Sequence, residues 1–152
     1  MNKINSTKIR EECGVFGISN IEEASALTTL GLHALQHRGQ EGCGIVSYDG
    51  RNYFSEKRFG LVGDNFNNQD TIKKLPGSYA IGHNRYSTTG GKILRNVQPF
   101  FADTNAGGIG VSHNGNLTNA ITLRKKLVED GAIFYTTSDT ETSIQLVARS
   151  KK

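Results

Sequence analysis

The chain has 152 residues, of which 36% are hydrophobic and 21% charged, and it contains two cysteines. This length suits one domain, and the composition is typical of a globular protein without a disulfide scaffold. No stretch approaches the roughly 20 consecutive apolar residues of a membrane-spanning helix, and the first twelve residues lack the apolar run of a signal peptide. We therefore expect a cytoplasmic protein with reduced thiols.

The net charge of +4 does not indicate a nucleic-acid surface. The first twelve residues have one net positive charge and residues 149–152 have three, which leaves residues 13–148 neutral overall. The run Arg124-Lys125-Lys126, on a predicted helix, is more typical of a solvated face than of a phosphate track. We expect neither a nucleic-acid partner nor a membrane partner.

Hydrophobic patterning predicts a mixture of strands and helices. The predicted strands are Cys13–Ile18, Cys43–Tyr48, Asn52–Lys57, Ala80–Ser87 and Gly108–His113. The predicted helices are Glu22–His37, Thr118–Asp130 with Gly131 as its stop, and a last helix from about Thr140 to the end of the chain. This order indicates α+β or layered α/β/β/α architecture and not a parallel doubly wound sheet.

Local signals refine these elements. The first helix is expected to bury the stripe of Ala24, Leu27, Leu30 or Gly31, and Ala34 or Leu35. Asp49-Gly50 predicts a two-residue hairpin turn. Ser138-Asp139-Thr140-Glu141 fits a capping box. The last helix has no stop signal, and its Ile144, Leu146 and Val147 need a partner surface, so we expect part of a larger domain.

Cys13 is a candidate nucleophile. If the polar leader were removed, its thiol would lie beside a free α-amine, whose pKa near 7.7–8.0 suits a general base at neutral pH. The alternative is a small buried apolar residue, and the residues alone favour it about two to one. Cys43, between two glycines in a predicted strand, is expected to be buried and inert.

Three further positions each have a chemical and a structural interpretation. Asn114-Gly115 could supply donors to an oxyanion, or form a type I′ turn. Arg85 could bind a substrate carboxylate, or form a surface ion pair. Asp139 could bind a substrate ammonium, or assist the cap of the last helix.

Other patterns are weaker. His33 and His37 have the spacing of two zinc ligands on a helix, but the residue after the first is Ala34 and not glutamate, so helix packing is the favoured interpretation and no metal site is expected. The run Gly107-Gly108-Ile109-Gly110 lacks the spacing of a dinucleotide-binding loop.

Six blocks of sequence, taken in order, resemble the glutaminase domain of the class II glutamine amidotransferases. They are ECGVFGI (Glu12–Ile18), GLHALQHRGQEGCGI (Gly31–Ile45), GHNRYSTTG (Gly82–Gly90), NVQPF (Asn96–Phe100), SHNGNLTNA (Ser112–Ala120) and TTSDTE (Thr136–Glu141). The leader and the run HNGNLTNA favour the amidophosphoribosyltransferase branch, which acts in purine synthesis. With this resemblance, the nucleophile becomes the favoured interpretation of Cys13.

The resemblance implies an N-terminal nucleophile hydrolase fold, a four-layer α/β/β/α sandwich, here incomplete. Residues 1–12 would be a leader or propeptide, and residues 13–152 a C-terminally truncated glutaminase domain. Cys13 would attack the side-chain amide of glutamine, with Asn114 and Gly115 as the oxyanion hole. By the same resemblance, Arg85 and Thr88 would hold the glutamine carboxylate and Asp139 its α-amine, and Arg38 and Gly39 would support the nucleophile's loop.

The resemblance also implies partners outside this chain. A phosphoribosyltransferase domain would receive the ammonia, and the full-length protein is expected to be a homo-oligomer. Mg²⁺ and, in some relatives, an iron–sulfur cluster would belong to the missing part, since two thiols cannot supply four cluster ligands. Two alternatives remain open: the glutaminase domain of another class II amidotransferase, and a non-catalytic fragment that acts only in binding or assembly.

Overall fold

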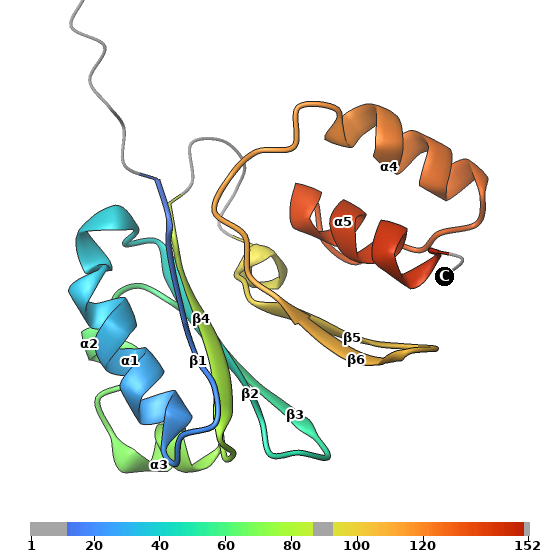
Figure 1. The fold of residues 1–152 in the computed structure, drawn as a ribbon. Helices are drawn as coiled ribbons and strands as arrows, with labels where there is room; N and C mark the ends of the chain where they lie inside the picture. The colour runs from blue at the N-terminus through green and yellow to red at the C-terminus, as the bar shows by residue number, and fades with distance from the viewer. Residues whose placement is uncertain (1–11, 87–92, 151–152) are drawn as a thin grey trace, which may run out of the picture.

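Two antiparallel sheets lie between two helical layers in the computed structural model, which describes residues 12–86 and 93–150. Sheet A has the strand order β1 (Gly14–Ile18), β4 (Tyr79–Arg85), β2 (Gly42–Tyr48) and β3 (Tyr53–Phe59), and sheet B consists of β5 (Phe100–Thr104) and β6 (Gly107–Val111). Helix α1 (Ala24–Ala34) covers the outer face of sheet A, and α4 (Ala120–Glu129) and α5 (Asp139–Ala148) lie beyond sheet B (Figure 1). The predicted α/β/β/α sandwich is confirmed.

The predicted strands and long helices are present, with shifted ends. The first helix begins at Ala24 because Glu23 has a left-handed φ of 57°, and it ends at Ala34, before the 3₁₀ turn η1 (Gln36–Arg38). Strand β5 was not predicted, nor were three short elements: α2 (Val62–Asn65), α3 (Gln69–Lys73) and the 3₁₀ turn η2 (Leu94–Asn96). Elements this short give little periodic signal.

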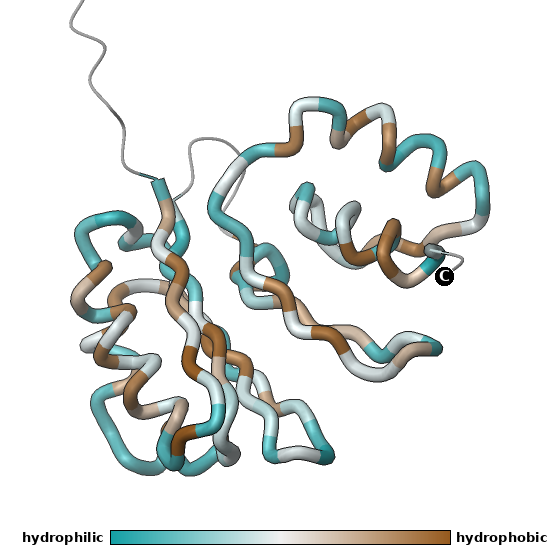
Figure 2. The backbone as a smooth tube through the Cα atoms, in the orientation of Figure 1, coloured by the Kyte–Doolittle hydropathy of each residue, from teal (hydrophilic) through white to brown (hydrophobic). Residues whose placement is uncertain are grey.

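The predicted buried stripe of α1 is partly wrong. Leu27 and Leu30 are exposed, and the helix buries Ala24, Ser25, Thr28 and Leu32. The Ser25 hydroxyl can be buried because it donates to the Leu75 carbonyl at 2.6 Å. Below this face lies the hydrophobic core, which contains Ala24, Leu32, Cys43, Ile45, Val62, Phe66, Leu75 and Ala80. Figure 2 shows hydrophobic residues recurring along α1 and the adjacent β1.

The local turn and cap signals are mostly correct. Gly131, at φ 81°, ends α4 in a Schellman motif, because its N–H donates to Val128 and that of Ala132 to Leu127. The hairpin tip consists of Gly50 and Arg51, one residue later than predicted, since the Asp49 N–H still donates to the Asn52 carbonyl.

The predicted capping box of α5 is half formed. The Ser138 hydroxyl accepts from the Thr140 N–H, whereas the Glu141 carboxylate accepts from the N–H groups of Tyr135 and Thr136. Of the three apolar residues expected to need a partner surface, Ile144 is buried, while Leu146 and Val147 are exposed.

The close approach of the two sheets depends on a glycine. The backbone at Gln98 passes directly over Gly44 in β2, so a Cβ at Gly44 would lie 2.3 Å from the Gln98 carbonyl oxygen. His83 is the partner of Gly44 in β4, and directly opposed residues share a sheet face. The segment that leads into sheet B is therefore stacked on the Gly44–His83 pair.

His83 is a buried polar group in this inner layer. Its side chain is 1% exposed, and neither ring nitrogen makes a hydrogen bond of ordinary geometry to the described residues. Burial lowers the pKa of His83 to about 4; the nearby His113 carbonyl opposes this effect, and the charges of Arg85 and His113 add to it. The ring is therefore neutral at physiological pH.

In the part of the chain that the structure describes, no helix has the length and apolar character needed to cross a membrane.

We expect Gly44→Ala to destabilise the protein by about 1–3 kcal/mol, the usual cost of forcing a methyl group into a filled interior. Gly110→Ala is the matched control, because the nearest atom to a Cβ there lies at 3.4 Å, an ordinary contact. Urea unfolding measures both variants. Equal losses of stability would show that the Gln98 backbone can move away from β2 at little cost.

We expect His83 to make the folded state less stable in mild acid. Between about pH 6.5 and pH 4 the unfolded chain binds a proton at this ring and the folded protein does not, so stability falls as the pH falls. His83→Phe removes this contribution while keeping a ring. Urea unfolding at several pH values should show a steeper loss for the wild type than for the variant, and parallel curves would contradict the assignment.

Candidate functional site

The thiol of Cys13 lies against the end of β4. Its Sγ accepts a hydrogen bond from the Tyr86 N–H at 3.4 Å and lies 3.6 Å from the Tyr86 carbonyl oxygen. Cys13 itself is half-buried and has a left-handed φ of 56°, a conformation that costs a non-glycine residue roughly 1–2 kcal/mol. The backbone is thus bent at the residue that carries the thiol.

The carbonyl oxygen of Cys13 is held from two sides. The Arg38 Nε donates to it at 2.7 Å, and the Asn114 Nδ2 donates to it at 3.4 Å. A second guanidinium nitrogen of Arg38 donates to the Glu12 carbonyl at 3.4 Å. One arginine from η1 therefore fixes the peptide carbonyls on both sides of the Cys13 α-carbon.

The electrostatics of the site keep the Cys13 thiol protonated in this chain. Burial raises its pKa, the hydrogen bond from the Tyr86 N–H opposes this effect, and the nearby Glu12 raises the pKa further. The charges of Arg85 and Arg38 lower it. A base that removes the thiol proton is therefore needed for nucleophilic attack.

Gly39 and Arg85 meet at the end of β4. A Cβ at Gly39 would lie 2.6 Å from the Arg85 carbonyl carbon, so the backbones of η1 and β4 touch there. The Glu41 N–H donates to the Arg85 carbonyl at 3.1 Å. The Arg85 guanidinium makes no ion pair with a described carboxylate, so the alternative of a structural ion pair is not supported within residues 12–86 and 93–150.

Asn114 and Gly115 follow β6 and reach the same site. A type I′ turn requires a positive φ at both central residues. Neither Asn114 nor Gly115 has a positive φ, so the alternative of a type I′ turn is wrong. The segment is held by Gln98, whose side-chain amide accepts from the His113 N–H at 2.8 Å and donates to the His113 carbonyl at 3.3 Å. The His113 ring packs under Gly115, where a Cβ would lie 2.6 Å from its Nε2.

Asp139 connects α5 to this loop. Its Oδ2 accepts from the Leu117 N–H at 2.7 Å, and its Oδ1 lies 4.0 Å from the Nδ1 of His113. The N-cap of α5 is Ser138, and Asp139 is an acidic residue in the first turn of that helix, which is compatible with the alternative that it assists the cap. One carboxylate oxygen is thus used by the loop, and the other makes no hydrogen bond shorter than 3.5 Å to the described residues.

The predicted site residues converge, with one exception that lies outside the described residues. Cys13, Arg38 and Asn114 are joined by hydrogen bonds, Gly39 and Arg85 adjoin them at the end of β4, and Asp139 is tied to the Asn114–Leu117 loop. Thr88 is in the part of the chain that the structure leaves undescribed.

Three residues that contribute contacts to this site were not predicted: Tyr86, Gln98 and His113. Tyr86 contacts the thiol through its backbone, and a backbone contact cannot be predicted from the type of side chain. Gln98 lies within the block NVQPF and His113 within the block SHNGNLTNA. Both blocks carry the resemblance, but no role was predicted for either residue.

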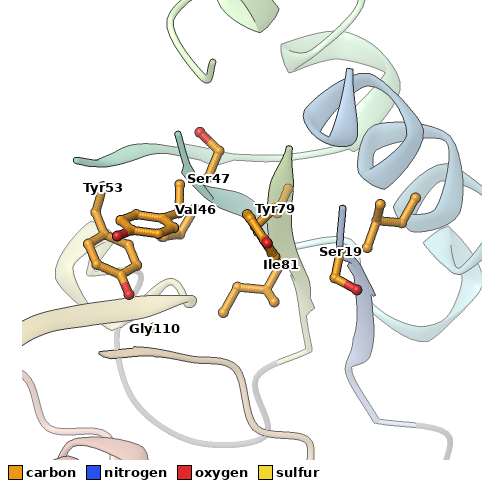
Figure 3. Close-up of a pocket in the computed structure, with 10 residues that line it drawn as sticks. Ser19, Val46, Ser47, Tyr53, Tyr79, Ile81 and Gly110 are labelled. Atoms are coloured by element: carbon orange, nitrogen blue, oxygen red, sulfur yellow. The ribbon is translucent and has the colours of Figure 1, made fainter. Parts of the chain in front are cut away.

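Two other features lie apart from this site. Among the described residues, no group of three or more His, Cys, Asp or Glu side chains is arranged to hold a metal ion. A cavity of about 280 Å³ on the inner face of sheet A is lined mainly by apolar and aromatic side chains, including Val46, Tyr53, Tyr79 and Ile81 (Figure 3). No predicted site residue lines it. Cys43 is fully buried as expected, and burial raises the pKa of its thiol to about 12.

Comparison with known proteins gives a consistent result. A family model described as a glutamine amidotransferase domain matches residues 83–152. The chain is 57% identical over 143 residues to an amidophosphoribosyltransferase of Rhizobium etli, a match that covers 94% of this chain and 29% of that relative. It is 48% identical over 141 residues to an amidophosphoribosyltransferase of Lacticaseibacillus casei, with 93% of this chain and 73% of the relative covered.

Solved structures agree in fold. The glutamine phosphoribosylpyrophosphate amidotransferase from B. subtilis, complexed with ADP and GMP, matches with a TM-score of 0.81 and 46% identity. That match covers 91% of this chain and 30% of the other chain, and the chain likewise spans 29% and 30% of the Rhizobium etli and Vigna aconitifolia relatives. The sequence identity, the coverage and the shared fold together show that this chain belongs to the amidophosphoribosyltransferase family, and that its residues 83–152 match the family's glutamine amidotransferase domain.

Proposed function

We propose that this chain hydrolyses glutamine with Cys13 as the nucleophile and supplies the ammonia to an amidophosphoribosyltransferase reaction. The observation that carries the proposal is the position of the Cys13 thiol at the end of β4, where the Tyr86 N–H donates to it, with the Cys13 carbonyl held by Arg38 and Asn114. Membership of a family with a glutamine amidotransferase domain supports the same chemistry.

The proposed nucleophile requires removal of residues 1–12 as a leader. While Glu12 is attached, the nitrogen of Cys13 is an amide and cannot accept a proton. A free α-amine at Cys13, with a pKa near 7.7–8.0, would take the thiol proton directly or through water. The thiolate then attacks the side-chain amide carbon of glutamine, ammonia leaves, and water hydrolyses the thioester to glutamate.

Asn114 and Gly115 are proposed to stabilise the oxyanion of the tetrahedral intermediate. The 3.4 Å bond from Asn114 to the Cys13 carbonyl is longer than an ordinary N–H···O bond of about 2.9 Å and is therefore weak. A small movement would turn the Asn114 amide toward the oxyanion, which lies on the substrate carbon bonded to Sγ. The Gly115 N–H would be the second donor.

Arg85 and Asp139 are proposed to recognise the two charged ends of glutamine. Arg85 would bind the α-carboxylate, together with Thr88, and the Oδ1 of Asp139 would accept from the α-ammonium. Arg38 and Gly39 would keep the Cys13 backbone in place. The hydrogen bond from Leu117 to Oδ2 supports this role, because it orients the Asp139 carboxylate.

The ammonia is proposed to form 5-phosphoribosylamine in purine synthesis, in a homo-oligomeric full-length protein with a phosphoribosyltransferase domain. Mg²⁺ and, in some relatives, an iron–sulfur cluster would be held by that domain. Among the described residues, no group of three or more His, Cys, Asp or Glu side chains is arranged to hold a metal ion, and Cys43 is fully buried in the core.

Treatment with 6-diazo-5-oxonorleucine, a glutamine-like electrophile, should give one adduct on Cys13 after loss of residues 1–12. Intact mass spectrometry reads processing and labelling together. Cys13→Ala should take no adduct, and Cys43→Ala should be labelled like the wild type, because the Cys43 thiol is buried and its pKa is about 12. A chain that keeps the leader and takes no adduct would favour the alternative of a non-catalytic fragment.

Asn114→Ala and Asp139→Asn should separate the two proposed roles. Loss of one oxyanion donor typically lowers kcat by about 10²–10³-fold, so Asn114→Ala should reduce kcat of glutamine hydrolysis with little change in KM. Asp139→Asn should mainly raise KM, because it weakens binding of the substrate ammonium. Steady-state glutamate release measures both, and an unchanged kcat in Asn114→Ala would remove Asn114 from the oxyanion hole.

A further inference from the structure

A second cavity, of about 270 Å³, lies between the outer strand of sheet A and helix α5. Its lining combines two cationic side chains, Lys57 and Arg95, with aromatic rings and one carboxylate, that of Glu141. Phe100 and Ile144 are buried, whereas Arg95 and Tyr135 are exposed. The cavity therefore has an apolar floor and a cationic, aromatic mouth, and no proposed glutaminase residue lines it.

Lys57 lines this cavity and makes no ion pair within residues 12–86 and 93–150. Its neighbour across the sheet is Gly44, and its Nζ lies 4.6 Å from the centre of the Phe100 ring. The side chain is half-buried, and no carboxylate of the described residues lies within 4 Å of the ammonium. Burial lowers the pKa of Lys57 to about 8, with no nearby acid to oppose this effect. A half-buried ammonium without an anionic partner is costly.

Glu141 makes no ion pair with Lys57, and its carboxylate is hydrogen-bonded to other groups. Its Oε1 accepts from the Tyr135 N–H at 2.8 Å, and its Oε2 accepts from the N–H and the hydroxyl of Thr136, each at 2.7 Å. These three donors hold the carboxylate toward the segment before α5. Arg95 also lacks an ion pair within the described residues, and its guanidinium lies 5.9 Å from the centre of the Tyr135 ring.

We propose that this cavity binds a small organic anion, whose carboxylate or phosphate oxygens meet Lys57 and Arg95 and whose apolar part lies against Phe100 and Tyr135. Lys57 and Arg95 make no ion pair with the described residues. They attract an anion more strongly than a solvated surface does, because the surroundings of Lys57 are partly dehydrated. The cavity volume suits a molecule of a few heavy atoms more than a nucleotide.

Benzoate and inorganic phosphate are the two probes, applied separately to the ¹⁵N-labelled 152-residue chain. Benzoate should give saturable NMR shifts of residues around the cavity, and phosphate should do the same if the charged group alone is sufficient. Saturation by benzoate alone would identify a carboxylate with an apolar group as the ligand class, and saturation by phosphate alone a phosphate. Absence of saturable shifts with both probes would overturn the proposal.

Lys57→Met tests the central contact, since methionine keeps the length of the side chain and removes its charge. It should weaken the affinity for the effective probe at least tenfold, whereas Lys125→Met, on the exposed face of α4, should leave it unchanged. Lys57→Met should also be at least as stable as the wild type without anion, because a costly buried charge is removed. Equal affinity in Lys57→Met and the wild type would refute the site.

The protonation of Lys57 provides a readout that a purely structural lysine would not show. In anion-free buffer its ammonium should titrate near pH 8, and with saturating probe its pKa should rise, because a bound anion stabilises the charged form. The other charged or titratable groups that line the cavity are Arg95, Tyr135 and Glu141. An unchanged Lys57 titration in the presence of bound probe would show that the anion lies elsewhere.

Discussion

Cys13 is the residue at which three distant parts of the chain meet. Arg38 reaches its carbonyl oxygen from the turn after α1, Asn114 reaches the same atom from the loop after β6, and the Cys13 thiol contacts the backbone of Tyr86. A carbonyl that accepts a charge-assisted bond of 2.7 Å is held more firmly than one bonded to neutral donors alone. The geometry of the candidate site depends on this residue, because the bond from Arg38 fixes the backbone that carries the thiol.

The two sides of sheet A serve different purposes. Under α1 lies the hydrophobic core, whose side chains are mainly aliphatic and aromatic. On the inner side, a glycine in β2 allows the Gln98 backbone to approach, and polar or charged side chains, among them His83 and Lys57, are partly or fully removed from water. The inner side of the sheet thus removes a histidine and a lysine from water, whereas the α1 side is mainly apolar.

The loops that carry the site obtain their order from side chains, since their backbone groups are not paired in a sheet. Buried or half-buried backbone groups need hydrogen-bond partners, and amide or carboxylate side chains supply them here. The pairs are Gln98 with His113, Asn96 with Thr137, Glu141 with Thr136, and Asp139 with Leu117. Gln98, which precedes β5, and Asp139 of α5 therefore hold the loop of Asn114 from two sides.

The sequence by itself determined the layered fold, the strands of sheet A and the Schellman stop at Gly131, because these depend on local periodicity and turn chemistry. The ordered blocks of residues also indicated the family and most of the site. Only the tertiary structure decided that Ser25 and Thr28, and not Leu27 and Leu30, face the core, because partners distant in sequence set which side of a helix is covered. The backbone contact of Tyr86 and the unpaired charge of Lys57 likewise arise from long-range packing, which no local pattern records.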